Sequence, residues 1–158
     1  MNYVVPPPSV VSIPVAGGDD RFPVRRVICV GRNYEAHARE MGRDPSREPP
    51  FFFTKPADAI VPDGSAVPYP PETKNFHYEM ELVVVIGRVA RDVPVARAWD
   101  CVAGFCVGQD VSDRAQQFAG KPPQFSLGKS APAFGPIGPA LVSLDELLQR
   151  LPGMPPEA

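Results

Sequence analysis

The stretch Phe76–Gly87, with the sequence FHYEMELVVVIG, constrains the fold more than any other part of the chain. Within it, Tyr78–Ile86 predicts a β-strand, because an apolar β-branched run follows directly on an alternating segment. Such an apolar strand is expected in the middle of a sheet, with neighbouring strands on both edges. Side chains on a strand repeat every two residues, so Glu79 and Glu81 leave the same face, roughly 6.5–7 Å apart.

The paired glutamates allow two interpretations. Two like charges beside a buried run are unfavourable unless a cation holds them, and a divalent ion that prefers oxygen ligands would do so. Alternatively, both glutamates line a solvated face while Met80, Leu82 and Val84 face the core, which is the ordinary alternation of a strand. From this stretch alone the solvated face is the slightly simpler interpretation.

Proline limits the helical content, since the chain contains 22 prolines among 158 residues. Proline interrupts helices and is confined to loops and edge strands. The length suits a single domain with its own core. We therefore expect an α+β fold dominated by mixed β-sheet, with short peripheral helices. Residues 1–24 are expected to form a proline-rich lead-in, with a short edge strand near Val10–Val15.

The remaining composition excludes several classes of protein. The net charge of −2 gives no indication of a nucleic-acid partner or a membrane surface. No apolar run approaches the roughly 20 residues that span a bilayer, and the N-terminus lacks the basic segment of a signal peptide. Cys29, Cys101 and Cys106 have spacings that fit neither a disulfide set nor a zinc site, which favours buried thiols in a reducing compartment. We expect a soluble cytoplasmic protein.

A histidine and a glutamate share one face of a predicted helix. After a buried strand over Arg25–Val30, Asn33 is a plausible N-cap for a short helix through Met41. On that helix His37 and Glu40 are spaced i, i+3, so the two side chains can touch. A glutamate beside a histidine raises the basicity of the ring, as a general base requires. An exposed ion pair on a surface helix explains the spacing equally well.

Two further residues lie next to predicted strands. Phe51–Phe53 predicts a buried strand, and Lys55 follows it, either reaching a site or marking where the strand meets water. His77 precedes the glutamate strand and is expected to support the carboxylates rather than to bind an ion directly.

A third carboxylate is expected at the end of another strand. Gly104–Val111 predicts a strand that ends in Asp110, whose oxygens would point into the cleft above the sheet. Ser112 is expected to cap the following helix, and Asp113 suits its first turn because the helix macrodipole favours an acid there. Ala131–Pro139, APAFGPIGP, is expected to be a rigid turn system.

Five motifs in a fixed order resemble the fumarylacetoacetate hydrolase family, between about Arg25 and Val142. They are GRNYEAHAREM, FFFTKP, HYEMELVVVIG, GQDVSDR, and FSLGKS with FGPIGP. The resemblance implies that residues 25–158 form a catalytic domain, a mixed β-sheet or β-roll with short peripheral helices. It also implies activity on a small 2-oxo acid. Because the chain is expected to leave an apolar strand edge open, we expect a homo-oligomer or a fold that depends on a missing segment.

The resemblance also implies a set of site residues. In the family, two glutamates of an E-x-E strand and an aspartate bind Mg²⁺ or Mn²⁺, and these fall on Glu79, Glu81 and Asp110. A catalytic histidine–glutamate pair falls on His37 and Glu40. The lysine of the G-K-S segment falls on Lys129, which would stabilise a developing oxyanion.

This sequence departs from the family pattern in two places. The family domain continues beyond the point where this chain ends, with the strands that close the roll and a substrate-side loop. We therefore expect a fold that is incomplete at the C-terminus, as in a fragment, a truncated product or a chain completed by a partner. The segment DVSDRAQQ also differs from the commoner DVSARDLQ form, so a different substrate group is possible there.

The implied chemistry is metal-dependent cleavage of a carbon–carbon bond in an acylpyruvate or a related 1,3-dicarbonyl 2-oxo acid. The same site would serve oxaloacetate decarboxylation, or isomerisation and hydration of 2-oxo-dienoates. A rival from another class is a catalytically incomplete fragment that acts only as a metal-binding or assembly module, with unpaired strand edges.

Overall fold

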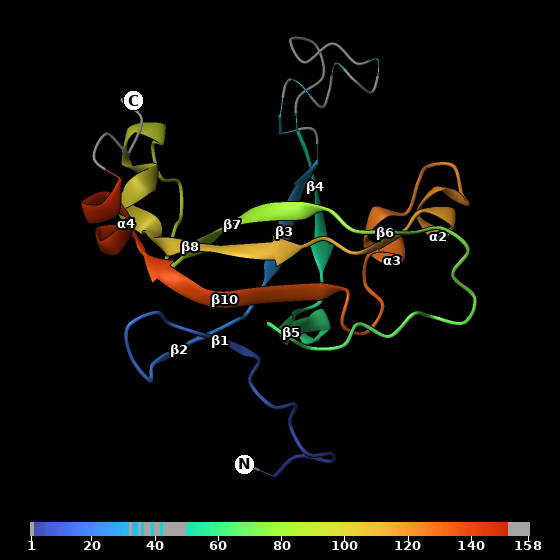
Figure 1. Cartoon of the computed structure of the whole chain (residues 1–158), viewed down its shortest axis with the longest axis horizontal. Helices are drawn as coiled ribbons and strands as arrows, with labels where there is room; N and C mark the ends of the chain where they lie inside the picture. Colours follow the sequence, from blue (N-terminus) through green and yellow to red (C-terminus); the bar gives the residue numbers. More distant parts are fainter. Residues whose placement is uncertain are drawn as a thin grey trace.

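The computed structural model describes residues 2–31, 33, 34, 36, 39, 42 and 50–151. His37, Glu40 and most of the helix expected after Asn33 lie outside these residues. The described chain is an α+β fold built from one mixed sheet, three small strand pairs and short helices, as the proline content predicts (Figure 1).

The main sheet has four strands in the order β5-β10-β8-β7. Strand β8 (Val102–Gln109) lies antiparallel to both β7 (Met80–Ile86) and β10 (Gly135–Ser143). Strand β5 (Ile60–Pro62) lies parallel to β10, which makes the sheet mixed. The strands expected near residues 78–86 and 104–111 are therefore present as β7 and β8.

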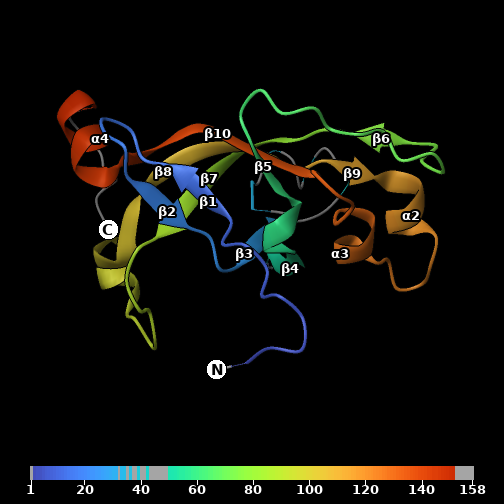
Figure 2. The same cartoon turned by 90° about the horizontal axis from the view of Figure 1, so that it is seen from below.

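Three antiparallel pairs accompany the main sheet. They are β1 (Ser12–Pro14) with β2 (Arg21–Pro23), β3 (Val27–Gly31) with β4 (Phe51–Lys55), and β6 (Phe76–His77) with β9 (Ser112–Asp113). The β3–β4 pair crosses the strands of the main sheet, and Figure 2 shows it on one side of that sheet. This crossing brings Lys55, the last residue of β4, beside Asp110, which follows β8.

The core lies between the main sheet and the first strand pair. Its buried side chains are Ile13, Val85, Cys106, Ile137 and Leu141. The backbone of the N-terminal segment is fixed to β10, because the amide of Ala16 donates to the carbonyl of Leu141 at 2.8 Å. The inward-facing apolar residues of β7 and β8 therefore fill the space between the main sheet and the β1–β2 hairpin.

The two faces of β7 are arranged opposite to the solvated-glutamate interpretation. Met80, Leu82, Val84 and Ile86 point outward and are 66%, 60%, 48% and 49% exposed, respectively. The intervening residues face the core side, so the interpretation that placed Met80, Leu82 and Val84 in the core is wrong. In the described part of the chain, β7 is an edge strand and not the central one that its apolar sequence predicts.

The helices are short, and the α-helices lie at the two ends of the sheet. They are η1 (Ala57–Ala59), η2 (Val95–Cys101), α2 (Arg114–Phe118), α3 (Phe125–Gly128) and α4 (Leu144–Arg150). In Figure 1, α4 lies at one end and α2 and α3 at the other. Within the described ranges no helix exceeds seven residues, and none has the length and apolar character to cross a bilayer.

The cap of helix α2 differs from the expected one. The side chain of Asp113, and not that of Ser112, accepts a hydrogen bond from the amide of Gln116 at 3.0 Å. Ser112 belongs to β9, and its fully buried hydroxyl contacts Lys129 instead. The expectation of a Ser112 cap is therefore wrong, because this hydroxyl serves a tertiary contact that local sequence does not show.

The segment expected as a rigid turn system, Ala131–Pro139, is only partly a turn. Strand β10 begins at Gly135 and continues through Pro136 and Pro139 to Ser143. Proline lacks the amide that a ladder needs, but Pro139 falls in the register shift between Gly138 and Val142, where the pairing with β8 is interrupted. The strand therefore accommodates this proline at an irregularity.

Candidate metal centre

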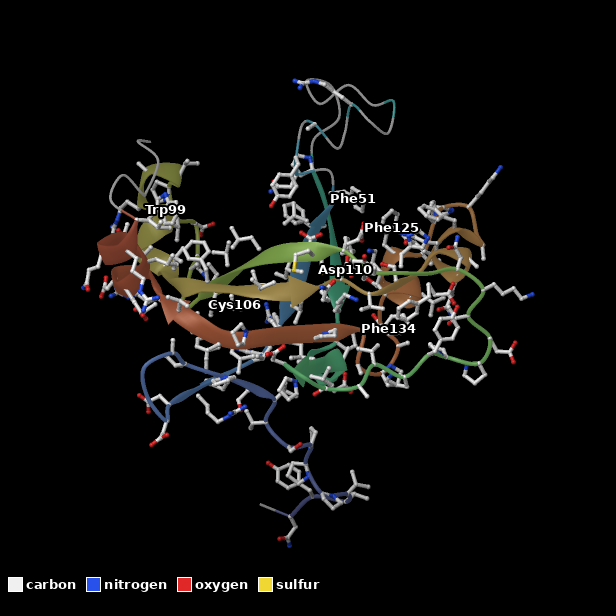
Figure 3. The ribbon with its side chains drawn as sticks, viewed as in Figure 1. Phe51, Trp99, Cys106, Asp110, Phe125 and Phe134 are labelled. Carbon is white, nitrogen blue, oxygen red and sulfur yellow. The ribbon has the colours of Figure 1, made fainter. Side chains whose placement is uncertain are left out.

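The pairing of β7 with β8 brings three carboxylates together. In the antiparallel register Glu81 lies opposite Gly108, and the amide of Asp110 donates to the carbonyl of Glu79 at 2.8 Å. One oxygen from each of Glu79, Glu81 and Asp110 lies within 4.8 Å of the other two. Figure 3 shows Asp110 where β8 ends, close to the place where β4 crosses the sheet. The shared face predicted for the two glutamates therefore exists, and the expected aspartate joins it.

The ammonium group of Lys129 lies among these carboxylates. Its Nζ is 2.7 Å from Glu79 Oε2 and 2.6 Å from Asp110 Oδ2, and it donates to the hydroxyl of Ser112 at 2.7 Å. The side chain is only 2% exposed, and Nζ lies 5.3 Å from the centre of the Phe53 ring. Such a buried charge is stable only because its hydrogen bonds are satisfied and its charge is opposed.

A close contact between two helices places Lys129 there. Helix α3 ends at Gly128, and a Cβ at this position would lie 2.6 Å from the amide nitrogen and 2.7 Å from the Cα of Gln117 in α2. Only glycine permits this approach, because the obstructing atoms belong to the backbone of Gln117. The glycine before Lys129 therefore lets α3 pack against α2 and directs the lysine toward the carboxylates.

Lys55, which the sequence left undecided between a site and a strand end, is buried at the centre. Its Nζ lies 2.8 Å from Asp110 Oδ1, and its side chain is 4% exposed. The ammonium also donates to the carbonyls of Val111 at 3.1 Å, Phe134 at 3.0 Å, and Lys129. Asp110 therefore has a lysine on each of its two carboxylate oxygens.

Arg114 completes the described set of charges, although it was not among the site residues predicted from the sequence. Its Nη2 donates to Glu79 Oε1 at 2.6 Å, and its Nη1 donates to Gln117 Oε1 at 2.9 Å. The i, i+3 spacing of Arg114 and Gln117 on a predicted helix is the one local signal that they would touch. Nothing local indicates that the arginine would reach a strand on the other side of the site.

The surrounding cations change the ionisation of Glu79. Burial alone would raise the pKa of this carboxyl, but Lys129 and Arg114 outweigh burial and hold the pKa below its ordinary value. For Lys55, burial is the larger influence and lowers the pKa of the ammonium, while the contact with Asp110 partly offsets it. Cys29 lies within electrostatic range of the same charges, and burial raises the pKa of its thiol to about 11.

The donor set fits a hard divalent cation. Mg²⁺ and Ca²⁺ bind oxygen ligands at about 2.0–2.6 Å, so oxygens on one ion lie at most roughly 4–5 Å apart. The carboxylate oxygens of Glu79, Glu81 and Asp110 meet this condition. The three acidic side chains are half-buried or buried, so they also require positive charge nearby. Lys55, Lys129 and Arg114 provide this charge in the structure.

The described contacts of this cluster include none of the other predicted site residues. The expected catalytic pair, His37 and Glu40, lies outside the described residues. His77 is exposed, and its Nε2 lies 2.7 Å from the side-chain oxygen of Asn75. The expectation that His77 supports the carboxylates is therefore not met in the described contacts.

The chain matches a known family over most of its length. The family described as fumarylacetoacetate (FAA) hydrolase, C-terminal, matches residues 26–153. Among curated proteins, oxaloacetate tautomerase FAHD2A, mitochondrial, from Bos taurus is 41% identical over 122 residues, which cover 77% of this chain and 38% of the relative. The chain spans about half the length of the curated relatives that it matches.

The chain is also similar to solved structures. Fumarylpyruvate hydrolase from Pseudomonas aeruginosa, in complex with Mn²⁺ and pyruvate, superposes with a TM-score of 0.84 at 47% identity, covering 92% of this chain and 65% of that protein. For 5-carboxymethyl-2-hydroxymuconate delta-isomerase from Mycobacterium smegmatis, the TM-score is 0.67 at 37% identity, and the match covers 85% and 49% of the two chains.

The charge contacts of Glu79 lead to a prediction about acid sensitivity. Because Lys129 and Arg114 hold its folded pKa below the ordinary 4.5, the unfolded state takes up a proton first as the pH falls. The stabilisation by Glu79 is therefore complete above pH 4.5 and is lost as the pH falls through the folded pKa. We expect Glu79→Gln to lower the free energy of unfolding of the metal-free protein by about 1–3 kcal/mol at neutral pH, with the difference closing in acid. Urea unfolding across a pH series measures it.

The control for this prediction is Glu72→Gln, which changes an exposed glutamate. That variant should match the unmodified protein at every pH. If the difference in the free energy of unfolding between Glu79→Gln and the unmodified protein widened as the pH fell, the lowered pKa of Glu79 would be contradicted.

Proposed function

The chain belongs to the fumarylacetoacetate hydrolase family, and we propose that it carries the metal-holding half of an enzyme that cleaves a carbon–carbon bond in an acylpyruvate or a related 1,3-dicarbonyl 2-oxo acid. The observation that supports this proposal most is the cluster of Glu79, Glu81 and Asp110, with the ammonium of Lys129 bound to Glu79 and Asp110. The cluster combines a hard-cation donor set with a buried positive group at one point.

The similar proteins point toward one class of small molecule. Fumarylpyruvate and oxaloacetate, which appear in the names of two of them, are both 2-oxo acids with a further carbonyl group. When the carbon between the two carbonyl groups of such an acid loses a substituent or a proton, an enolate remains. A site that stabilises an enolate suits cleavage and isomerisation alike, and the similar proteins include both a hydrolase and an isomerase.

Glu79, Glu81 and Asp110 would hold the metal, either Mg²⁺ or Mn²⁺, which when bound supplies the positive charge that stabilises an enolate. A Mn²⁺ ion is present in the fumarylpyruvate hydrolase that this chain resembles. The cluster in this chain offers a carboxylate oxygen from each of the three residues.

The remaining residues would bind the acid and move its protons. The positive charge of the Lys129 ammonium, whose hydrogen bonds go to Glu79, Asp110 and Ser112, would stabilise negative charge that develops on a substrate oxygen. The guanidinium of Arg114, held by Glu79 and about one-fifth exposed, offers a cationic group to the substrate carboxylate. His37 and Glu40 would act as the pair that deprotonates a water molecule for attack on the distal carbonyl.

Two other functions of the same site have specific support. Oxaloacetate chemistry is favoured by the similarity to an oxaloacetate tautomerase, and 2-oxo-dienoate isomerisation or hydration by the similarity to a muconate isomerase. A metal-binding or assembly module without activity of its own is a further alternative, because the chain spans only part of its relatives. Assaying fumarylpyruvate-type, oxaloacetate and dienoate substrates with Mg²⁺ and with Mn²⁺ separates these alternatives.

The outer face of β7 suggests how the chain assembles. Its four apolar side chains are about half to two-thirds exposed, and no described strand pairs with the outer edge of β7. An open apolar edge promotes pairing with another strand. We propose that a second copy of the chain covers this face in a homo-oligomer, acting in the cytoplasm.

The first prediction of the proposed function concerns the metal. Glu81→Ala removes one of three ligands, so calorimetric titration with Mn²⁺ should show that binding is lost or weakened by roughly 100-fold or more. Glu72→Ala, at an exposed glutamate, is the matched control and should bind as the unmodified chain does. Unchanged affinity in Glu81→Ala would refute the assignment of the ligands.

The second prediction concerns the base. His37→Ala should abolish hydrolysis of an acylpyruvate, with a loss of roughly 100-fold or more in kcat, while the affinity for Mn²⁺ stays nearly the same. Steady-state kinetics and calorimetry on the same preparation measure the two quantities. A parallel fall in Mn²⁺ affinity would make His37 a ligand and would overturn its role as base.

The third prediction concerns assembly. Light scattering should show a homo-oligomer, and Leu82→Glu, which places a charge on the outer face of β7, should shift it toward monomer. Lys74→Glu is the control, since Lys74 is exposed outside the strands. A monodisperse monomer with full turnover would show that this chain is active by itself and that no second copy covers β7.

A further inference from the structure

Lys55 is held by more groups than its charge alone requires. Its ammonium faces Asp110 Oδ1 at 2.8 Å and the carbonyls of Val111, Phe134 and Lys129. An ammonium has three hydrogens to donate, and the three carbonyls accept them, so the contact with Asp110 Oδ1 is an ion pair without a hydrogen bond. Lys55 is the last residue of β4, and acceptor atoms surround its ammonium group.

These acceptors belong to separate segments of the chain. Asp110 and Val111 follow β8, Lys129 follows α3, and Phe134 precedes β10. Lys55 itself is directed by β4, where it pairs with Val27, and by Pro56, which begins the turn into η1. One ammonium group therefore ties together the backbone segments that carry the buried carboxylate and the buried lysine of the site.

We propose that Lys55 is a positioning residue that fixes Asp110, and the backbone on which Lys129 stands, in the geometry that a divalent metal ion requires. This proposal rests on the proposed function for the metal but concerns a residue that does not touch it. With its side chain 4% exposed and its Nζ enclosed by backbone carbonyls, Lys55 has no free hydrogen for a substrate.

The chemistry of the lysine side chain suits this task. A compact ammonium at the end of a flexible stem can donate in three directions to three carbonyls, whereas the planar guanidinium of arginine cannot. Asp110 needs one oxygen held so that the other keeps its direction. Lys55 contacts Oδ1 at 2.8 Å, while Oδ2 contacts Lys129 at 2.6 Å.

The test compares Lys55→Met with two matched variants. Lys55→Met keeps the length and apolar volume of the stem but removes the charge and the donors. Lys121→Met makes the same chemical change at an exposed lysine, and Ile13→Ala destabilises the core away from the site. The affinity for Mn²⁺ is measured by calorimetry at a temperature at which circular dichroism shows every variant to be folded.

We expect Lys55→Met to bind Mn²⁺ about 10–100-fold more weakly than the unmodified chain, the usual effect of removing a group that orients a ligand. Lys121→Met and Ile13→Ala should keep the original affinity. In Lys55→Ala, added propylammonium should restore part of the affinity by filling the vacated site, an effect that general destabilisation does not produce. Affinity equal to that of Lys121→Met, or a loss no greater than in Ile13→Ala, would overturn the proposal.

Hydrogen exchange separates this proposal from the metal assignment. If the unmodified chain and Lys121→Met bind no Mn²⁺, the proposed function fails, and the test of Lys55 passes to the metal-free protein. There, Lys55→Met should raise the exchange rate of amides in residues 110–113 and 129–135 at least about tenfold relative to Ile13→Ala. Exchange rates equal to those of Ile13→Ala in both segments would overturn the role of Lys55 without reference to metal.

Discussion

The buried contact of Asp110 with two lysines is the interaction on which the site depends. Lys55 and Lys129 each hold one oxygen of this carboxylate, and all three side chains are less than one-tenth exposed. Removing charges from water is unfavourable by several kcal/mol per ion, and only close partners with full hydrogen bonding offset it. Because the partners come from β4, β8 and the segment after α3, the site forms only when these distant elements pack correctly.

The sequence predicts which residues of β7 share a face, but it does not predict which face is inside. A period of two groups Glu79 with Glu81 and groups Met80, Leu82 and Val84 together, and the structure keeps both groups. Hydrophobicity then favours the apolar group as the buried one, which is the opposite of what the structure shows. Glu79 and Glu81 face inward because cations from other elements lie on that side. The local sequence pattern does not show where those cations lie.

The same limit explains the residues that sequence reasoning left open or missed. Lys55 follows a strand, and a lysine in that place looks the same whether it ends in water or among buried carbonyls. Ser112 is a good helix cap by composition, yet its hydroxyl is used by Lys129 and Asp113 caps α2. Arg114 touches Gln117 within its own helix but finds Glu79 across the site. In contrast, the short helices and the mixed sheet follow from proline content and strand periodicity, which are local properties.

The charges of the described cluster also balance, which bears on how an ion would enter it. Three carboxylates stand against three cations: Glu79, Glu81 and Asp110 against Lys55, Lys129 and Arg114. Many small metal-dependent domains fold only when the ion binds, because the unfolded chain rarely contains a formed site. Here the lysines and the arginine already oppose the repulsion of the carboxylates, so the ligand cluster stands preformed. A dication would then add two positive charges to a balanced site, and an acidic ligand that brings negative charge with it is the natural counterpart.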